Sequence, residues 1–388
     1  DAGDVELNAG GDLAIVGMLD AGTDGVISLI SGGVITGNSP ADVQAAEISI
    51  TANGSVEIRD PDDLVITALN LTGSNQDVYI EVGGALTVTD DFVLDGSGAL
   101  DLVVGGNLTI ESDVGTDSGA INFAVTGDLS LIEGVDLVAQ TGAITLNAGG
   151  ALTMTDATIV DAGSGALAIQ AGGDLTLGYR VATSSTSDVT ITSTSGAIID
   201  GGDSPPDVIA PNAKLILRAV TGIGGIGPGG TLELAVKELA VHNSGTGAID
   251  LFVAGDLELL ALEQTSGAVD IAVAGELTLS NDVAVEGSVS LAASEGIVLN
   301  APISTSSGTV SLYTETGDIA LNAGIAVQSG DIILTALAGS VRDTRSAWVQ
   351  DGAAFAAWIE WALTNRKFSV DATSGAVVIA NASAAEES

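Results

Sequence analysis

The sequence predicts an all-β fold, a right-handed parallel β-helix with about three short strands in each coil. Three observations support this prediction. A short alternating strand returns about every 20 to 23 residues. A glycine turn and a second alternating strand follow within most repeats. Period-two alternation and abundant Val, Ile and Thr oppose the period of 3.6 that a helical solenoid would need.

The first strand of each repeat has the form apolar, any residue, apolar. It occurs at Val5–Leu7, Ile27–Leu29, Ile48–Ile50, Val78–Ile80, Leu100–Leu102, Ile121–Phe123, Ile144–Leu146, Leu167–Ile169, Val189–Ile191, Ile249–Leu251, Val269–Ile271, Val289–Leu291, Val310–Leu312, Ile332–Leu334 and Val377–Ile379. Most successive spacings fit one structural unit that recurs and stacks on itself.

The second strand follows glycines such as Gly105-Gly106 and Gly149-Gly150. We expect these glycines to supply a positive φ at a sharp corner. A weaker apolar pair such as Ile159-Val160 forms the third strand. About 16 coils, each rising about 4.8 Å, predict a rod on the order of 75 to 80 Å long with like-on-like aliphatic ladders inside. The handedness follows from the crossover rule for parallel strands.

Residues 1–388 are interpreted as a single solenoid and a fragment of a longer chain, because neither end shows a polar cap. The start lacks a basic segment followed by an apolar one, so we expect no signal peptide there. Three segments interrupt the repeat. Residues 60–72 predict a modest loop, residues 200–247 predict coils with extended loops, and residues 335–375 predict an insertion.

The insertion contains all three tryptophans of the chain and several of its few cations. Helical spacing of its aromatic residues predicts a short amphipathic α-helix near residues 352–364. The helix would either brace the flank of the β-helix or form a contact patch for an acidic neighbouring copy or for stacked sugar rings. The patch residues are Arg342, Arg345, Trp348, Phe355, Trp358, Trp361, Arg366 and Lys367.

The charge is strongly one-sided, with 51 acidic residues against 9 Lys and Arg, a formal charge of -42. Such a surface repels nucleic acid and anionic lipid, so we expect neither nucleic-acid binding nor membrane insertion. No apolar run reaches the length of a membrane span. The absence of cysteine excludes disulfides and thiolate metal sites.

Few residues are candidates for a binding or catalytic site. The glycine-rich run Gly222–Gly230 lacks the Gly-Lys-Ser/Thr of a phosphate-binding loop. His242 is the only histidine and is expected in a strand or corner. Weak calcium candidates are Asp60, Asp62, Asp63, Asp113 and Asp117, although calcium-binding nonapeptide repeats are missing. No catalytic residue or cofactor is predicted.

With its coils laid out, as in Gly142–Thr153, the chain resembles the repetitive region of filamentous-haemagglutinin-like adhesins and related giant bacterial surface proteins. The resemblance covers nearly the whole chain and implies export and a role in adhesion or extracellular assembly. It implies no catalytic residue, and the Asn-Pro-Asn signatures of the family's secretion domain are absent.

The sequence therefore predicts a non-enzymatic, secreted protein of the bacterial surface, a structural shaft or filament segment. Its expected partners are neighbouring copies, further segments of the same protein, carbohydrate, or a host or cell surface. Two alternatives remain open. The first is a β-helical enzyme acting on polysaccharide, although Asp90, Asp91 and Asp101 lack the basic or aromatic neighbours that a catalytic groove of this kind needs. The second is a calcium-dependent surface-array protein.

Overall fold

A computed structural model of the chain describes residues 3–37, 40–202, 206–225 and 230–343, together with the backbone of two later strands. The described residues form all-β parallel solenoid coils, about 15 in all, with three strands per coil. The described residues contain no helix. The predicted fold class is thus confirmed, whereas the helix expected near residues 352–364 lies outside the described residues.

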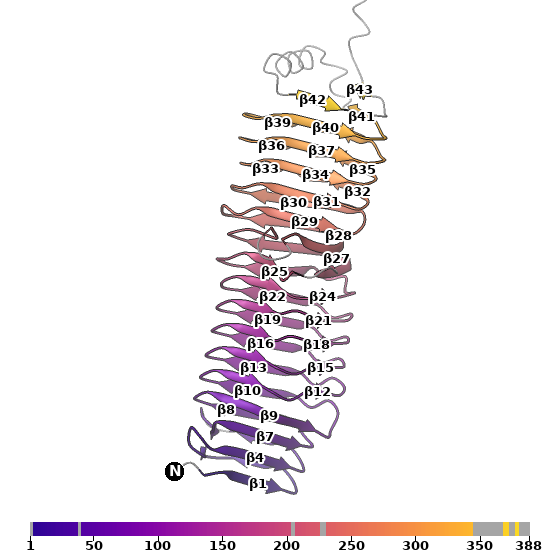
Figure 1. Cartoon of the computed structure of the whole chain (residues 1–388). Coiled ribbons are helices and arrows are strands. Elements are labelled where there is room, and N and C mark those ends of the chain that lie inside the picture. The colour runs from indigo at the N-terminus through magenta and orange to yellow at the C-terminus, as the bar shows by residue number, and fades with distance from the viewer. Residues whose placement is uncertain are drawn as a thin grey trace, which may run out of the picture. The chain divides into compact units, whose positions relative to one another are not determined.

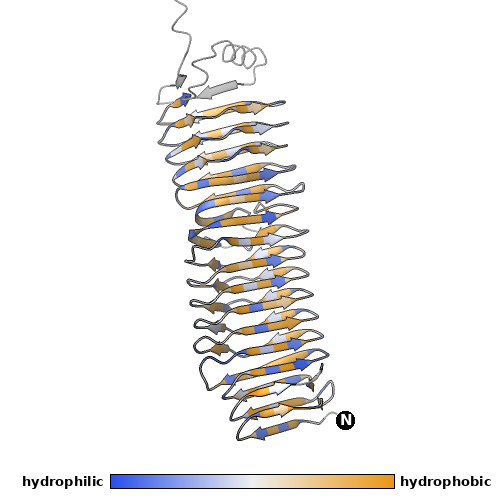
Figure 2. Ribbon diagram, turned by 180° about the vertical axis from the view of Figure 1, so that it is seen from behind, coloured by the Kyte–Doolittle hydropathy of each residue, from blue (hydrophilic) through white to orange (hydrophobic). Residues whose placement is uncertain are grey.

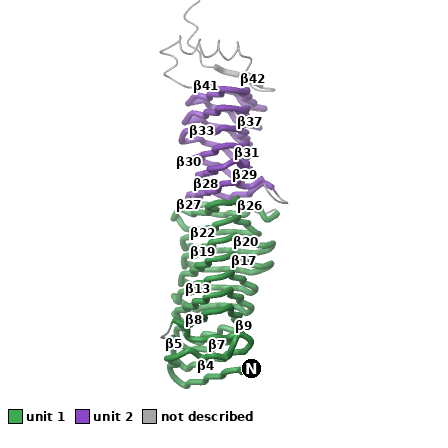
Figure 3. Tube along the Cα trace, turned by 90° about the vertical axis from the view of Figure 1, so that its left-hand side faces the viewer, with its two compact units in different colours: residues 1–213, 227–229 green, residues 214–226, 230–388 purple. Residues whose placement is uncertain are grey.

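The chain divides into two compact units, residues 1–213 with 227–229 and residues 214–226 with 230–388 (Figure 3). The boundary falls inside strand β27 (Val208–Ala219). Each unit is described by itself, and the expectation of a single solenoid stays a prediction.

Unit 1 contains a 10-stranded parallel sheet and two further stacks of parallel strands. The sheet consists of β1 (Val5–Ala9), β4 (Val26–Ser31), β7 (Glu47–Ala52), β9 (Leu64–Leu71), β11 (Leu86–Val88), β14 (Leu108–Ile110), β17 (Leu129–Leu131), β20 (Leu152–Met154), β23 (Leu175–Leu177) and β26 (Ile198–Asp200). The second stack consists of β2 (Leu13–Ile15), β5 (Ile35–Gly37), β8 (Val56–Asp60), β10 (Val78–Val82), β13 (Leu100–Val104), β16 (Ile121–Val125), β19 (Ile144–Ala148), β22 (Leu167–Ala171) and β25 (Val189–Ser193). The third consists of β12 (Phe92–Leu94), β15 (Val114–Thr116), β18 (Asp136–Ala139), β21 (Ile159–Asp161) and β24 (Arg180–Ala182). β3 (Leu19–Asp20) and β6 (Val43–Gln44) pair separately.

Side chains alternate between interior and surface along each strand, which Figure 2 shows as alternating hydropathy. In-register pairing then places equivalent residues of successive coils directly above one another. One interior ladder runs through Ile58, Ile80, Leu102, Phe123, Leu146, Ile169 and Ile191, each at most 2% exposed. Full burial of one such side chain stabilises the fold by about 1.5–3 kcal/mol. The predicted aliphatic ladders are confirmed.

The corner glycines have a different physical reason from the one expected. Gly105, Gly149 and Gly172 do not have a positive φ. A Cβ on Gly105 would lie 2.3 Å from the carbonyl oxygen of Gly83 in the coil below, and one on Gly172 would lie 1.8 Å from that of Gly149. The expectation of positive φ is therefore wrong at these corners. Glycine is needed because successive coils approach too closely to admit a side chain.

Residues 60–72 also differ from the prediction, because they contain strand β9 and not only a loop. Leu64, Ile66 and Leu69 are at most 4% exposed and give β9 an interior face. Ile48 of β7 consequently pairs with Ile66, while Val78 pairs with Val56 of β8. The list of first strands implies that Ile48–Ile50 stacks directly below Val78–Ile80. That is wrong, because the long interval between the two strands includes this extra strand.

Unit 2 has the same architecture. β28 (Leu232–Asn243) pairs with both β29 and β30. One stack consists of β29 (Ile249–Val253), β31 (Val269–Val273), β34 (Val289–Ala293), β37 (Val310–Thr314), β40 (Ile332–Ala336) and β42 (Phe368–Asp371). A second consists of β30 (Leu257–Gln264), β32 (Glu276–Leu279), β35 (Gly296–Leu299), β38 (Ile319–Leu321), β41 (Val341–Asp343) and β43 (Val377–Ile379). The far end of β30 also begins a third stack with β33 (Val283–Val285), β36 (Ile303–Thr305) and β39 (Ile325–Val327).

The segment 200–247 contains two long strands of the solenoid. Strands β27 and β28 are each 12 residues long, and His242 lies within β28. Its placement in a strand was one of the two positions that the sequence predicted.

Candidate functional site

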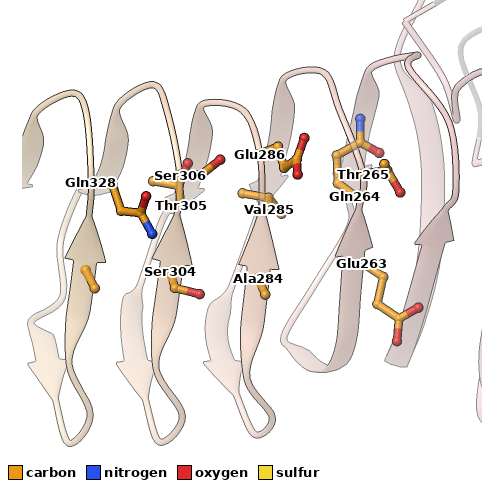
Figure 4. Close-up of a pocket in the computed structure, with 11 residues that line it drawn as sticks. Glu263, Gln264, Thr265, Ala284, Val285, Glu286, Ser304, Thr305, Ser306 and Gln328 are labelled. Carbon is orange, nitrogen blue, oxygen red and sulfur yellow. The ribbon is translucent and has the colours of Figure 1, made fainter.

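A trough of about 460 Å³ lies in unit 2 along the third stack of strands (Figure 4). It spans four successive coils, from the end of β30 to the end of β39. Its lining residues are Glu263, Gln264, Thr265, Ala284, Val285, Glu286, Ser304, Thr305, Ser306, Ala326 and Gln328. The trough is the candidate functional site because it combines a hollow with many polar side chains.

The hollow results from small side chains at equivalent outward positions. Ala284, Ser304 and Ala326 stand in register on β33, β36 and β39, directly in line with Glu263 of β30. Outward positions recur with period two, so all four residues face the same side. Three small residues in succession leave a shallow floor between the strand faces and the corner residues Thr265, Glu286, Ser306 and Gln328.

Buried polar side chains hold the wall behind the trough. Asn243, Gln264 and Thr305 are 1%, 3% and 2% exposed and occupy inward positions. Asn243 Nδ2 donates to Gln264 Oε1 at 2.8 Å, and Gln264 Nε2 donates to the carbonyls of Gly247 and Ser266. Thr305 Oγ1 donates to the carbonyl of Gly287 at 2.7 Å. Because these bonds tie strand ends to corners, the wall is a fixed surface.

One end of the trough carries a positioned carboxylate. His242 Nδ1 lies 2.8 Å from Glu263 Oε2, and the two residues are register partners on β28 and β30. The Glu263 side chain remains 73% exposed. Glu263 can therefore accept hydrogen bonds from a ligand while the imidazole restricts its rotamer.

The trough lining has no positive charge among its described residues, and Glu263 and Glu286 are its only ionisable groups. Within the described chain, the hydroxyls of Thr265 and Ser306 make no side-chain hydrogen bond to the protein. The backbone N–H groups of Thr265 and Ser306 donate to Asn243 and Val285 in the coil below, at 3.2 and 3.3 Å. The corners are thus fixed while their side chains stay available to a ligand.

A second hollow of about 340 Å³ lies in unit 1 next to the segment that contains three of the calcium candidates. Asp62 and Asp63 line it, and Asp60 is 2% exposed beside it. Asp60 Oδ1 accepts from the Asp62 N–H at 2.9 Å and Oδ2 accepts from the Ala45 N–H at 3.2 Å. Burial raises the pKa of Asp60 to about 6, although these two hydrogen bonds oppose the shift. In the described residues, the three carboxylates do not converge on one point.

The remaining calcium candidates also bond the backbone of a neighbouring coil. Asp113 Oδ1 accepts from the Asp136 N–H at 2.9 Å, and Asp117 Oδ2 accepts from the Gly96 N–H at 3.0 Å. Burial and the nearby Asp113 raise the pKa of Asp136. The structure does not bring Asp113 and Asp117 together with the group around Asp60, and calcium binding by any of these residues stays a prediction.

Only Arg342 of the expected contact patch is described. Arg342 Nη2 lies 3.0 Å from Asp318 Oδ2, and its side chain is 56% exposed. Arg345, Trp348, Phe355, Trp358, Trp361, Arg366 and Lys367 lie outside the described residues. The contact patch stays a prediction.

A charge cluster around Arg59 in unit 1 was not predicted from the sequence. Its guanidinium contacts the carboxylates of Glu57, Asp42 at 3.5 Å and Glu81 at 3.3 Å, and it lies 5.3 Å from the ring centroid of Tyr79. The hydrogen bond to Glu57 is the main cause that raises the pKa of Arg59. The available signal was a lone cation in an acidic chain with acids two residues before it and one coil above it.

The geometry of the described residues is that of a repetitive scaffold with a polar trough in unit 2. No family model, curated protein or solved structure matches the chain. Among the described residues, no helix has the length and apolar character needed to cross a membrane.

Proposed function

We propose that the chain is a structural shaft or filament segment of a secreted bacterial surface protein and has no enzymatic activity. The observation that carries the proposal is the continuous parallel pairing of coils within each unit, from β1 to β26 in unit 1 and from β29 to β40 in unit 2. A scaffold of this kind bears load because every interior coil is hydrogen-bonded to two neighbours.

Side chains add a second set of links between coils. Asp128 Oδ1 accepts from the Ala151 N–H at 2.8 Å, while the Asp128 N–H itself donates to Asn107 Oδ1 at 2.9 Å. Asp174 and Asp256 make the same kind of bond to Ala197 and Glu276, one coil further on. A recurring acid or amide at the start of a strand therefore continues the hydrogen-bond ladder around the corner.

This use of the acids supports the non-enzymatic proposal. Asp91 Oδ1 accepts from the Asp113 N–H at 3.3 Å, and Asp101 Oδ1 accepts from Asn122 Nδ2 at 2.7 Å. Both residues belong to the three acids, Asp90, Asp91 and Asp101, that were considered for a polysaccharide-active enzyme. Their hydrogen bonds link adjacent coils, which is a structural use of the carboxylate.

The resemblance to filamentous-haemagglutinin-like adhesins supports export to the cell surface, and the charge of -42 supports solubility outside the cell. Neighbouring copies or further segments of the same protein are the proposed partners. A mechanical role needs no cofactor.

Single-molecule force spectroscopy on the whole chain, held by terminal tags, tests the proposal. A shaft should resist extension and then lengthen in steps that correspond to groups of coils, because each coil contacts mainly its neighbours. Featureless extension at low force would contradict a load-bearing role. Turnover of any member of a panel of acidic and neutral polysaccharides would contradict the absence of enzymatic activity.

A further inference from the structure

We propose that the trough in unit 2 is a binding site for an uncharged linear polysaccharide that lies across the coils. This inference goes beyond the shaft, which needs no ligand. It rests on the chemistry of the lining residues, on their repetition and on the shape of the floor.

The lining residues select against negatively charged polymers. Glu263 and Glu286 are the only ionisable groups in the trough, and the chain as a whole is strongly acidic. A sulfated or uronic-acid polymer would meet like charge with no cation to offset it. A sugar without charge avoids this repulsion and can still donate its hydroxyl protons to the two carboxylates.

Hydrogen-bonding capacity matches a polyol. Carboxylates accept from pairs of hydroxyls, and the charge-assisted O–H···O⁻ bond is among the stronger hydrogen bonds in proteins. Thr265 and Ser306 supply hydroxyls that can both donate and accept, and Ser304 supplies one that can accept. Ser304 Oγ donates to the Val283 carbonyl at 3.3 Å and keeps its lone pairs for a ligand. A cation would find negatively charged ligands only at the two glutamates. Polar groups that can bind a polyol continue across all four coils.

Repetition favours a polymer over a small molecule. Equivalent positions recur once per coil, at about 4.8 Å. A β-1,4-linked hexopyranose chain advances by one ring in a similar distance, with alternate rings turned over, so each coil would meet one ring. The floor of Ala284, Ser304 and Ala326 leaves space for the rings, and Ala284 and Ala326 offer methyl groups to their C–H faces.

The rigid wall favours binding further. Gln264 and Thr305 are locked by buried hydrogen bonds, so little conformational entropy is lost when a ligand contacts the trough. The His242 contact likewise restricts Glu263 before any ligand arrives.

Isothermal titration of the full chain with three hexasaccharides tests the proposal: β-1,4-linked glucose, its uronic-acid counterpart and its glucosamine counterpart. The glucose hexamer should bind, and the uronic-acid hexamer should bind about tenfold more weakly or not at all. Tighter binding of the uronic-acid hexamer, tighter binding of the glucosamine hexamer at a salt concentration that screens the overall charge of the chain, or no binding of the glucose hexamer would overturn the proposal.

Two trough variants locate the site. Ala284→Leu and Ala326→Leu fill the floor and should each weaken glucose-hexamer binding by about tenfold. Ala320→Leu is the matched control, because Ala320 is an outward residue of β38 that does not line the trough. Equal affinity in all three variants would place the ligand elsewhere and overturn the proposal.

Hydrogen exchange of the wild-type chain gives an answer that does not depend on variant folding. Bound glucose hexamer should slow exchange at the corners around Thr265, Ser306 and Gln328, and protection confined to other coils would refute the site. Failure here leaves the force measurement on the shaft unaffected, so the two proposals are tested separately.

Discussion

Replacing Gly119 by alanine should disrupt unit 1 locally, because Gly119 belongs to a ladder of glycines that lie above one another at one corner. The ladder includes Gly98, Gly119, Gly142 and Gly165. A Cβ on Gly119 would lie 1.6 Å from the carbonyl oxygen of Gly98, and a Cβ on Gly142 would lie 1.7 Å from that of Gly119. Neither the φ of Gly119 nor that of Gly142 is positive, so steric approach alone requires glycine.

The magnitude follows from the space that is missing. Ordinary carbon contacts need about 3.5 Å, so one coil must move by about 2 Å against a coil spacing of about 4.8 Å. Such a shift breaks adjacent bonds, including Ser118 N–H to Gly96 O at 2.8 Å and Leu100 N–H to Ala120 O at 2.8 Å. Overpacking and one or two lost backbone bonds together predict a loss of about 3–5 kcal/mol in the free energy of unfolding.

Urea unfolding followed by circular dichroism measures this loss, and hydrogen exchange at Ser118 and Leu100 shows whether opening is local. The control is Gly173→Ala in the same unit, where the nearest atom to a new Cβ is 3.5 Å away and φ is not positive. The control should change stability by less than about 1 kcal/mol. Wild-type stability and exchange in Gly119→Ala, or equal losses in both variants, would refute the steric argument.

Three further perturbations test other parts of unit 1. Asp60 binds its proton more tightly when folded, so the free energy of unfolding should fall by about 2–3 kcal/mol as pH rises from about 4 to about 6. Urea unfolding of Asp60→Asn should lack that contribution, and a pH-independent difference from wild type would contradict the assignment. Asp128→Ala removes the acceptor for Ala151 N–H and should cost about 1 kcal/mol, whereas Asp128→Asn keeps an oxygen there and should cost less; equal losses in thermal unfolding would exclude this role. Phe123→Ala opens a cavity in the interior ladder and should cost about 3–5 kcal/mol by urea unfolding, and a loss below 1 kcal/mol would show that the ladder collapses to fill it.

The sequence predicted the fold class because its two main signals are local. Alternation in segments such as Ile144–Ala148 follows from the period of two, and the structure buries Ile144, Leu146 and Ala148 on one face. Repetition along the chain then implied stacking, since one coil alone cannot cover its apolar face. The same local signals misassigned β9, because Asp60-Pro61 and the Asn70-Leu71-Thr72 run resemble turns more than strand ends.

The trough was not predicted from the sequence. Glu263, Ala284, Ser304 and Ala326 are each unremarkable surface residues in their own repeats, and only the register of β30, β33, β36 and β39 makes them neighbours. The calcium candidates show that residues adjacent in sequence need not form one site. Asp60, Asp62 and Asp63 are adjacent in sequence, yet the fold directs their oxygens to different backbone N–H groups and to Gln44.

By itself, therefore, the sequence determined the strand period, the apolar interior and the stacking of coils, because these depend on residues close together in the chain. Tertiary structure decided the register, the steric reason for the corner glycines, the Arg59 cluster and the trough. Each of these depends on which residues, about one coil apart in sequence, come to lie about 4.8 Å apart in space.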